Sequence, residues 1–343
     1  MPKLLPQLLP KLIEVRGLTV ELPTEKGWVR PVNDVSFTLS RGETLGDVGE
    51  SGSGKTMLSL ALMGLEPTGA RRSGAALLRD RSTNPAAADG HSTNLITASP
   101  NEIRALRGRE IAMIFQEPMT ALNPVMRIGA QIEEAIRVHD ARCSSAEARS
   151  RAVEALKLAA VPEPAIRARQ YPHQLSGGLR QRALIAMALA AGPRGLIADE
   201  PTTARDATVQ KQILELLARL QRELGLAMIF ITHDLGVVAQ VAGRIAVMYA
   251  GRIIEEGPTD EILHQPGHPY TVGLLRAAPR LKRGTLTPIP GTVPALDALP
   301  PGCAFAPRCE FHRAECDIAV PELAAASPDH HARCILVSEG VAR

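Results

Sequence analysis

The stretch GESGSGKT occupies residues 49–56 and decides the fold. A short apolar segment, Leu45 to Val48, precedes it, and an apolar segment with helical character, Met57 to Met63, follows it. A strand, a glycine-rich loop and a helix in this order match the P-loop pattern, whose glycines let backbone N–H groups turn toward a phosphate. The complete eight-residue match disfavours the alternative, a glycine-rich turn without a ligand.

The P-loop pattern assigns an expected task to the polar side chains of this loop. Lys55 is expected to reach the β- and γ-phosphate oxygens of ATP, and the Thr56 hydroxyl to ligate Mg²⁺. The backbone around the glycines is expected to surround the β-phosphate, where the positive end of the next helix assists. The predicted nucleotide-binding residues of the loop are Gly49, Ser51, Gly52, Ser53, Gly54, Lys55 and Thr56.

A second element of the same chemistry ends in two acids. The apolar run Leu196 to Ala198 is followed directly by Asp199 and Glu200, as at the end of a buried strand. Asp199 is expected to hold Mg²⁺ through water, and Glu200 to polarise the attacking water as general base. Two acids at a strand end are a weak signal alone, but together with a P-loop they indicate nucleotide hydrolysis.

The periodicity of the other apolar residues predicts an α/β fold. Alternating apolar positions between Leu18 and Leu39 indicate antiparallel strands with one buried face. A helical period runs from Ile128 to Ala191, and Ser144 with Glu147 predicts a capping box before a helix that reaches about Ala160. Further strands are expected at 111–115, 195–198, 227–232 and 245–249, with a helix at 209–224. Alternating strands and helices predict a mostly parallel sheet covered on both faces.

Composition argues against several function classes. The 343 residues carry a formal net charge of only +3, and aromatic residues make up 3% of the chain, so a nucleic-acid partner is not expected. No apolar run approaches the roughly 20 residues of a membrane span. Prolines interrupt the leucine-rich start, Met1 to Leu12, which therefore does not match a signal peptide. We expect a cytoplasmic protein that reaches a membrane through its partners.

The octapeptide LSGGLRQR at 175–182 lies between the P-loop and the acidic strand end. In this order the three motifs resemble those of ABC nucleotide-binding subunits, and the resemblance covers nearly the whole chain. It implies an ABC-type P-loop ATPase with a RecA-like core, an antiparallel β subdomain, a helical subdomain and a small cysteine-containing C-terminal extension. It also implies a nucleotide-binding domain at 1–260, with the helical subdomain at about 117–180, and the extension at 261–343.

The resemblance assigns roles to residues outside the P-loop. Gln116 resembles the Q-loop glutamine, which contacts Mg²⁺ and couples to the membrane domain. Ser176, Gly177 and Gly178 resemble the signature, which faces the γ-phosphate of ATP held by the opposite chain. His233 resembles the switch histidine that touches the γ-phosphate, and this reading outweighs that of an ordinary core histidine.

Three further segments narrow the resemblance. They are FQEPMTALNP at 115–124, YPHQ at 171–174 and HPYT at 268–271, and they are similar to the oligopeptide/dipeptide importer ATPases. The segment IAMAL at 185–189 favours the D-type member of the paired D and F ATPases. Relatives in this group also carry nickel, glutathione or sugars, and the shared motifs do not separate these substrates.

This resemblance implies a set of partners and a location. Two integral-membrane permeases, a paralogous F-type ATPase and, indirectly, an extracellular or periplasmic solute-binding protein are the expected partners, without nucleic acid. The chain would lie peripherally on the cytoplasmic face of the inner or plasma membrane. The alternative is a soluble ABC ATPase of DNA repair or the ribosome, but the chain lacks a long coiled-coil insertion and a second cassette.

Four of the five cysteines are concentrated near the end of the chain. They are Cys303, Cys309, Cys316 and Cys334, whereas Cys143 stands apart. Thiolates ligate both iron–sulfur clusters and zinc, and this spacing does not choose between them. The Pro-Gly-Cys and Pro-Arg-Cys contexts resemble dipeptide-importer ATPases, which implies a [4Fe–4S] cluster. Zn²⁺, with His312, His330 or His331, is the alternative, and four reduced structural thiols are the third reading.

Four positions depart from the family pattern. Asp47 places a carboxylate in the strand before the P-loop, where the family has an apolar residue, and Gly195 replaces a bulky residue at the start of the strand that ends at Asp199. The segment Ala204-Arg205-Asp206 has arginine where the family has leucine, which places a charge near the expected dimer interface. Leu22 stands where an adenine-stacking phenylalanine is common. We therefore assign adenine stacking to Trp28, the only tryptophan, with a partner-facing role as the alternative.

Overall fold

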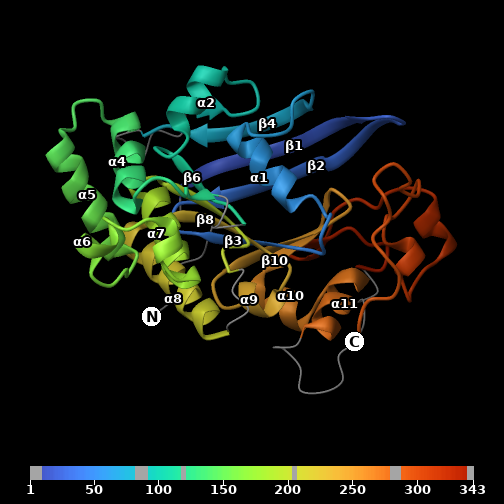
Figure 1. The fold of residues 1–343 in the computed structure, drawn as a ribbon. Helices are drawn as coiled ribbons and strands as arrows, with labels where there is room; N and C mark the ends of the chain where they lie inside the picture. The colour runs from blue at the N-terminus through green and yellow to red at the C-terminus, as the bar shows by residue number, and fades with distance from the viewer. Residues whose placement is uncertain (1–9, 82–91, 117–120, 203–206, 279–286, 338–343) are drawn as a thin grey trace. The chain divides into compact units, whose positions relative to one another are not determined.

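The computed structural model describes residues 10–81, 92–116, 121–202, 207–278 and 287–337 (Figure 1). The chain divides into two compact units. Unit 1 comprises residues 1–12, 40–42 and 99–229, and unit 2 comprises residues 13–39, 43–98 and 230–343. The segment Ala204 to Asp206 lies outside the described residues, so the expectation about Arg205 and the dimer interface stays a prediction.

Unit 2 contains an antiparallel sheet with the strand order β2-β1-β4-β5. Its strands are β1 (Lys11–Thr24), β2 (Gly27–Ser40), β4 (Arg71–Arg79) and β5 (Ser92–Asn94). Ile13 pairs with Leu78 and Val15 with Ala76, and all four side chains are buried. Alternate residues of a strand point to opposite faces, so this register collects the apolar side chains on one face. The predicted antiparallel strands with one buried face are confirmed.

A second run of strands in unit 2 has the order β11-β12-β10-β9-β3. The strands are β3 (Thr44–Val48), β9 (Arg244–Tyr249), β10 (Arg252–Pro258), β11 (Ala324–Ser327) and β12 (His330–Ala332). β3 and β9 are parallel, and β10 pairs antiparallel with both β9 and β12. The C-terminal extension therefore continues this sheet, which the sequence did not predict.

The helices of unit 2 are short. They are α1 (Lys55–Met63), α9 (Leu235–Val238), α10 (Thr259–His264) and α11 (Pro269–Ala277). Two turns of 3₁₀-helix, η3 (Ala306–Arg308) and η4 (Ala314–Asp317), belong to the extension. Gly46 on β3 lets α9 approach closely, because a Cβ atom there would lie 2.1 Å from Cγ2 of Val238.

Unit 1 carries a parallel strand pair, β6 (Ile111–Ile114) and β7 (Gly195–Asp199), in the register Ile111 to Gly195. All five residues of β7 are buried, as expected for a strand covered on both faces. β8 (Ala227–Thr232) begins in unit 1 and ends in unit 2. The strands predicted at 111–115, 195–198 and 227–232 are thus confirmed to within one residue.

Helices dominate the rest of unit 1. They are α2 (Pro100–Leu106), α4 (Ile128–His139), α5 (Ser145–Leu158), α6 (Pro164–Arg167), α7 (Gly177–Leu189) and α8 (Ala207–Leu224), with a 3₁₀ turn η2 (Pro172–Gln174). α5 packs against α4, α6 and α7 (Figure 1). Ser144 caps α5 by accepting a hydrogen bond from the Glu147 amide at 3.2 Å, as the sequence predicts. Among the described residues, no helix combines the length and apolar character that crossing a bilayer requires.

Candidate functional site

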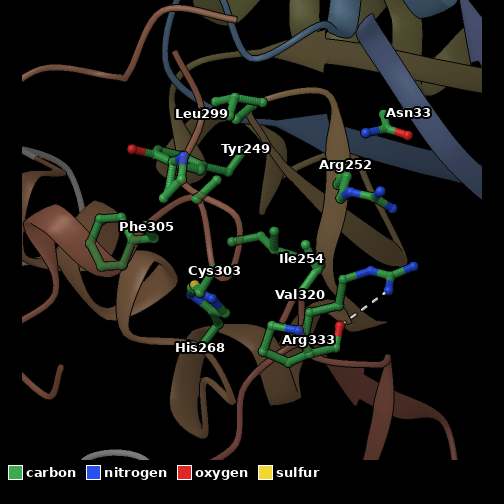
Figure 2. A pocket seen from close by; sticks show the side chains of 15 residues that line it. Asn33, Tyr249, Arg252, Ile254, His268, Leu299, Cys303, Phe305, Val320 and Arg333 are labelled. Carbon is green, nitrogen blue, oxygen red and sulfur yellow. Dashed lines mark hydrogen bonds between the residues drawn. The ribbon is translucent and has the colours of Figure 1, made fainter. Parts of the chain in front are cut away.

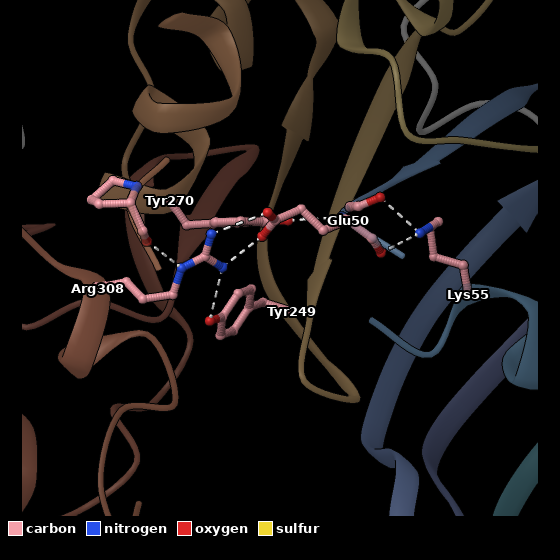
Figure 3. A network of polar contacts seen from close by, with 7 residues as sticks. Glu50, Lys55, Tyr249, Tyr270 and Arg308 are labelled. Atoms are coloured by element: carbon pink, nitrogen blue, oxygen red, sulfur yellow. Dashed lines mark hydrogen bonds and ion pairs between the residues drawn. The ribbon is translucent and has the colours of Figure 1, made fainter. Parts of the chain in front are cut away.

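The predicted phosphate loop connects β3 to α1 within unit 2. The Lys55 side chain is buried and folds back over the loop. Its Nζ donates to the carbonyl oxygens of Gly49 at 2.7 Å and Glu50 at 2.9 Å (Figure 3). It also donates to Oγ of Ser53 at 3.0 Å. These three oxygens accept the hydrogen bonds of the ammonium group. Phosphate oxygens of a bound nucleotide could replace them as acceptors.

Two positions in the loop require glycine for different reasons. Gly54, the residue before α1, has φ 109°, and a Cβ atom there would lie 2.1 Å from the Pro31 carbonyl oxygen. Gly49 has no such dihedral, but its Cβ atom would lie 2.2 Å from the Met248 carbonyl oxygen. The loop is therefore packed against the neighbouring backbone on one side, while Ser51 and Thr56 are exposed.

His233 follows β8 and is exposed in unit 2. The next residue, Asp234, starts α9 by accepting hydrogen bonds from the amides of Gly236 at 2.8 Å and Val237 at 3.3 Å. Its own amide donates to Oγ1 of Thr232 at 3.1 Å. The side chains on both sides of His233 thus fix its backbone at the end of the strand.

Trp28 is 43% exposed on β2. The guanidinium carbon of Arg71 lies 3.8 Å from its ring centroid, a cation–π contact that covers one face of the indole. Stacking of a base would be confined to the other face.

Unit 1 carries the predicted acids and the Q-loop glutamine. Asp199 is 2% exposed at the end of β7, and Glu200 follows with φ 43°. The side-chain amide of Gln116 donates to Oε2 of Glu200 at 2.8 Å. The left-handed φ of Glu200, a non-glycine residue, is strained and is typical of functional positions. Residues 117–120, within the segment FQEPMTALNP, lie outside the described residues.

The signature segment lies at the start of α7 in unit 1. Ser176 is the N-cap residue and accepts from the Leu179 amide at 3.4 Å, and Ser176 and Gly177 are exposed. Gly178 faces α8, because its Cβ atom would lie 3.2 Å from Cγ1 of Val209. An exposed helix start with a hydroxyl and two glycine amides can bind an anion.

The four C-terminal cysteines surround one small cavity in unit 2. The cavity has room for about one water molecule, and apolar side chains complete its walls. Its thiols come from Cys303, Cys309, Cys316 and Cys334. Burial raises the pKa of Cys303, Cys309 and Cys334, the last to about 11, and neighbouring thiols of the set add to each shift.

The state and the arrangement of the thiols bear differently on a metal at this cavity. None of the five cysteines, all of which are described, forms a disulfide, so the thiols are available as ligands. Within the described ranges, no group of three or more His, Cys, Asp or Glu side chains is arranged to hold a metal ion. The expected [4Fe–4S] cluster is therefore not supported by the arrangement of the thiols, although all four face the same space.

The histidines proposed as zinc partners do not line this cavity. His312 contacts Asp317 at 2.9 Å, and His330 contacts Glu255 at 2.7 Å as a buried pair. The histidine that does line it is His268, from the HPYT segment. Burial lowers the pKa of His268 to about 3, and its Nδ1 accepts from the Tyr270 amide at 3.0 Å.

A second cavity of about 190 Å³ adjoins the first, and His268 and Cys303 line both (Figure 2). Its other walls come from β9, β10 and the extension, including Tyr249, Ile254 and Phe305. Arg333 lines its rim and donates to the carbonyl oxygens of Ile253 at 3.0 Å and Pro321 at 3.3 Å.

One residue of the extension contacts the phosphate loop and was not predicted from the sequence. Arg308 donates to both carboxylate oxygens of Glu50, at 2.7 and 3.1 Å. The only signal in the sequence is the pair of charges itself, 258 residues apart. Charge pairs at that separation cannot be recognised without the fold.

Comparison with known families matches two parts of the chain. Residues 32–203 match the ABC transporter family, and residues 254–316 match the C-terminal region of oligopeptide/dipeptide transporters. The first match contains the phosphate loop, the signature and the acidic strand end. The second contains His268 and three of the four clustered cysteines.

Whole-chain relatives agree with this assignment. A putative peptide import ATP-binding protein of Brucella melitensis is 49% identical over 334 residues, which cover 94% of this chain and 96% of the relative. Another, of Brucella abortus, is 48% identical over 307 residues and 89% of each chain.

Solved structures resemble the fold. MJ0796, a bacterial ABC transporter cassette solved as a dimer, is 29% identical with a TM-score of 0.60, over 72% of this chain and 99% of that one. The protein cbiO1 of Clostridium perfringens, part of an ABC transporter complex, is 26% identical with a TM-score of 0.60, over 74% and 90%. The expected α/β P-loop fold is confirmed. The chain belongs to the ABC transporter family of ATP-binding proteins and is an ABC-type ATPase with an oligopeptide/dipeptide-transporter C-terminal region.

Proposed function

We propose that the chain is the ATP-hydrolysing subunit that energises an importer of di- or oligopeptides, or of related small solutes such as nickel or glutathione. The observation that carries this proposal is the combination of a complete ATP motif set with an oligopeptide-transporter C-terminal region in one chain. The names of the Brucella relatives, which describe peptide import, support the substrate class.

In this proposal the phosphate loop binds ATP. Lys55 leaves the loop carbonyls that it contacts and turns its ammonium group to the β- and γ-phosphates. The amides of the loop glycines and the start of α1 surround the phosphates. Because the lysine is already next to the loop, binding requires only a local exchange of acceptors.

The residues proposed to hold Mg²⁺ are Thr56, Gln116 and Asp199. They offer a hydroxyl, an amide and a carboxylate oxygen, and such hard oxygen donors suit this ion. When bound, Mg²⁺ would offset phosphate charge. Asp199 contributes from a buried strand end, so its carboxylate has little freedom to leave the position that β7 gives it.

Glu200 is proposed as the general base, and Gln116 as the residue that orients it. The 2.8 Å hydrogen bond from Gln116 holds one carboxylate oxygen and leaves the other to face a water molecule. Ser176, Gly177 and Gly178 would contact the γ-phosphate of ATP held by a second ATPase chain, and His233 that of its own chain. Catalysis would thus consist mainly of positioning and charge stabilisation.

The test of this function is a trapped complex. Glu200→Gln should abolish turnover while ATP binding persists, because the amide cannot take a proton from water. Glu215→Gln, an exposed change on α8, is the matched control and should hydrolyse ATP normally. Normal hydrolysis by Glu200→Gln would contradict the general-base role.

The same trapped protein, Glu200→Gln with ATP, can be used to identify the partners. Isolated from its native membranes with ATP, it should bring down two multi-span permeases and a paralogous F-type ATPase, with the solute-binding protein attached through the permeases. The location would then be peripheral, on the cytoplasmic face of the membrane. Recovery of ribosomes or DNA without a permease would instead favour a repair or ribosomal ATPase.

We also propose that the four clustered cysteines hold a [4Fe–4S] cluster, with Zn²⁺ as the alternative. The proposal rests on all four thiols bordering one cavity, and it requires the thiols to move and the cavity to widen, because their present arrangement does not suit a metal. Since ligation needs thiolates, raised thiol pKa values imply that binding releases protons and strengthens with pH.

Anaerobically purified protein should be brown and contain iron and sulfide, and Cys309→Ser should lose both. Cys143→Ser is the control, because Cys143 is also buried but does not border the cavity. Colourless protein with one zinc per chain would establish the alternative. Protein without either metal would leave four reduced thiols.

A further inference from the structure

The turn between Cys303 and Cys309 carries an arginine into contact with the phosphate loop. Arg308 ends η3 and its side chain is only 4% exposed. Its NH1 and NH2 groups donate to the two carboxylate oxygens of Glu50 at 2.7 and 3.1 Å (Figure 3). Glu50 is the second residue of the GESGSGKT loop, so the C-terminal extension reaches the loop expected to bind phosphate.

Several further contacts fix the guanidinium group. Nε of Arg308 donates to the Pro290 carbonyl oxygen at 2.8 Å, and NH1 also contacts the Tyr249 hydroxyl at 3.3 Å. The rings of Tyr249 and Phe305 lie 5.9 and 5.8 Å from the guanidinium carbon. A planar fork held on this many sides places its charge at one point, which a flexible lysine would not do.

Glu50 is held from its backbone as well. Its amide donates to the Tyr270 hydroxyl at 2.8 Å, and its carbonyl oxygen accepts from Nζ of Lys55 at 2.9 Å. Glu50 is therefore the link between Arg308 and Lys55. A change in the position of Glu50 would alter an acceptor of the lysine that is expected to bind phosphate.

The charge of Glu50 gives the contact its consequence. A carboxylate in a phosphate-binding loop repels the anionic nucleotide, and the repulsion is strong where solvent is partly excluded. Arg308 neutralises this carboxylate through a bidentate pair, and it does so from a side chain that solvent hardly reaches. Removing the arginine would leave the negative charge of Glu50 in the loop without a neutralising partner. It would also free the Glu50 side chain to move.

We propose that Arg308 is a positioning residue for the phosphate loop, through which the C-terminal extension sets the affinity of the chain for MgATP. Arg308 neutralises the carboxylate of Glu50 and fixes its side chain, in the residue whose carbonyl oxygen Lys55 is expected to exchange for a phosphate oxygen. The inference rests on the proposed function only in requiring that GESGSGKT binds ATP.

A double-mutant cycle on the full chain tests the charge relationship. Arg308→Gln should raise the Kd for MgATP about tenfold, because Glu50 then repels the phosphates. Glu50→Gln should bind MgATP as well as the unmodified chain, since it removes the repulsion. The double variant Glu50→Gln with Arg308→Gln should return to within about threefold of the unmodified chain.

A second arginine provides the matched control. Arg276 forms an ion pair with Glu310 in the same C-terminal region, but both are well exposed. Arg276→Gln should leave the Kd for MgATP unchanged. Arg308→Lys should give an intermediate Kd, because the charge stays while the two-pronged contact is lost.

The dependence of the Kd for MgATP on salt concentration gives a second test. A general loss of packing would not make the defect depend on salt. The defect of Arg308→Gln should shrink as ionic strength rises, because screening weakens the repulsion by Glu50. If Arg308→Gln does not fold, the Kd for MgATP is compared between the unmodified chain, Arg308→Lys and the neutral double variant.

An unchanged Kd in folded Arg308→Gln would overturn the proposal. A defect that Glu50→Gln does not relieve would also overturn it, because Arg308 would then act only as structural support. Failure of the proposed function looks different: the unmodified chain and every variant would bind no MgATP.

Discussion

The side-chain amide of Gln116 donates a 2.8 Å hydrogen bond to Oε2 of Glu200, although 84 residues separate them. β6 and β7 are parallel neighbours, so the residues that follow their carboxyl ends meet at one edge. The bond restricts a carboxylate whose backbone is already in a strained left-handed conformation.

This contact predicts a larger defect in turnover than in binding. Gln116→Ala should lower kcat for ATP hydrolysis by roughly ten- to a hundredfold, because an unrestrained Glu200 orients water poorly. The Kd for MgATP should rise by a smaller factor, because Thr56 and Asp199 remain to hold Mg²⁺. Steady-state hydrolysis and nucleotide titration check both values, with Gln212→Ala on α8 as control. An equal loss in binding would show that Gln116 acts mainly as a ligand.

The buried histidine beside the cysteine cavity predicts a pH dependence of stability. The pKa of His268 falls from 6.5 to about 3 on folding because burial disfavours its charged form. A lowered folded-state pKa stabilises the protein fully above pH 6.5, and this contribution is lost as the pH falls toward 3. Between pH 6.5 and 5 the loss should be about 1.5 kcal/mol in the free energy of unfolding.

His268→Asn isolates that effect. Asparagine keeps a side-chain acceptor for the Tyr270 amide at the start of α11 but has no titrating group. Urea unfolding at pH 6.5 and pH 5 should therefore show a smaller loss in the variant than in the unmodified chain. Equal losses would mean that His268 does not bind a proton on unfolding.

The buried contact between Glu255 and His330 is predicted to stabilise the extension against unfolding. Glu255 is fully buried and accepts from the amides of Gly267 at 2.6 Å and His268 at 3.0 Å, besides contacting His330 at 2.7 Å. Removing one partner of a buried pair typically costs about 3–5 kcal/mol. His330→Ala should therefore lower the free energy of unfolding by about 3 kcal/mol in urea melts.

The neighbouring residue provides the control for that experiment. His331 lies on the same strand, β12, but is only half-buried. His331→Ala should cost less than about 1 kcal/mol. Similar costs for the two substitutions would indicate that loss of the strand, not of the pair, dominates.

Two glycines predict opposite kinds of defect. Gly54→Ala places a Cβ atom 2.1 Å from the Pro31 carbonyl oxygen at φ 109°, so the free energy of unfolding should fall by at least about 2 kcal/mol. Gly177→Ala meets no atom within 4 Å, so stability should be unchanged while ATP hydrolysis falls. Thermal unfolding and hydrolysis, measured on both, separate the two effects. Because alanine keeps the backbone amide and adds only a Cβ atom, normal hydrolysis by Gly177→Ala would argue against a close approach of the nucleotide to Gly177.

Much of the cassette could be predicted because its signals are local. The strand–loop–helix around Lys55 and the capped helix after Ser144 both follow from short-range patterns, and both are confirmed. Asp199 was expected at the end of a buried strand, and β7 has that form. The roles assigned to these side chains and the domain boundary near residue 260 stay predictions.

The extension shows where local patterns give no information. Strands β11 and β12 are short and lack a marked apolar alternation, so only the pairing of β12 with β10 and of β11 with β12 defines them. The histidines offered as zinc partners do not line the cysteine cavity, and His312 and His330 contact carboxylates. His268 lies beside the cysteines because the start of α11 packs there.

The sequence by itself determined the family, the ATP motifs and several strands and helices of the cassette, since each depends on residues within a few positions of one another. Only the tertiary structure decided that Arg308 contacts Glu50, that Gln116 restrains Glu200, and that four thiols face one cavity. These relationships join residues that are distant along the chain. Their distances depend on how strands pair and loops pack, and no local preference of the amino acids encodes that.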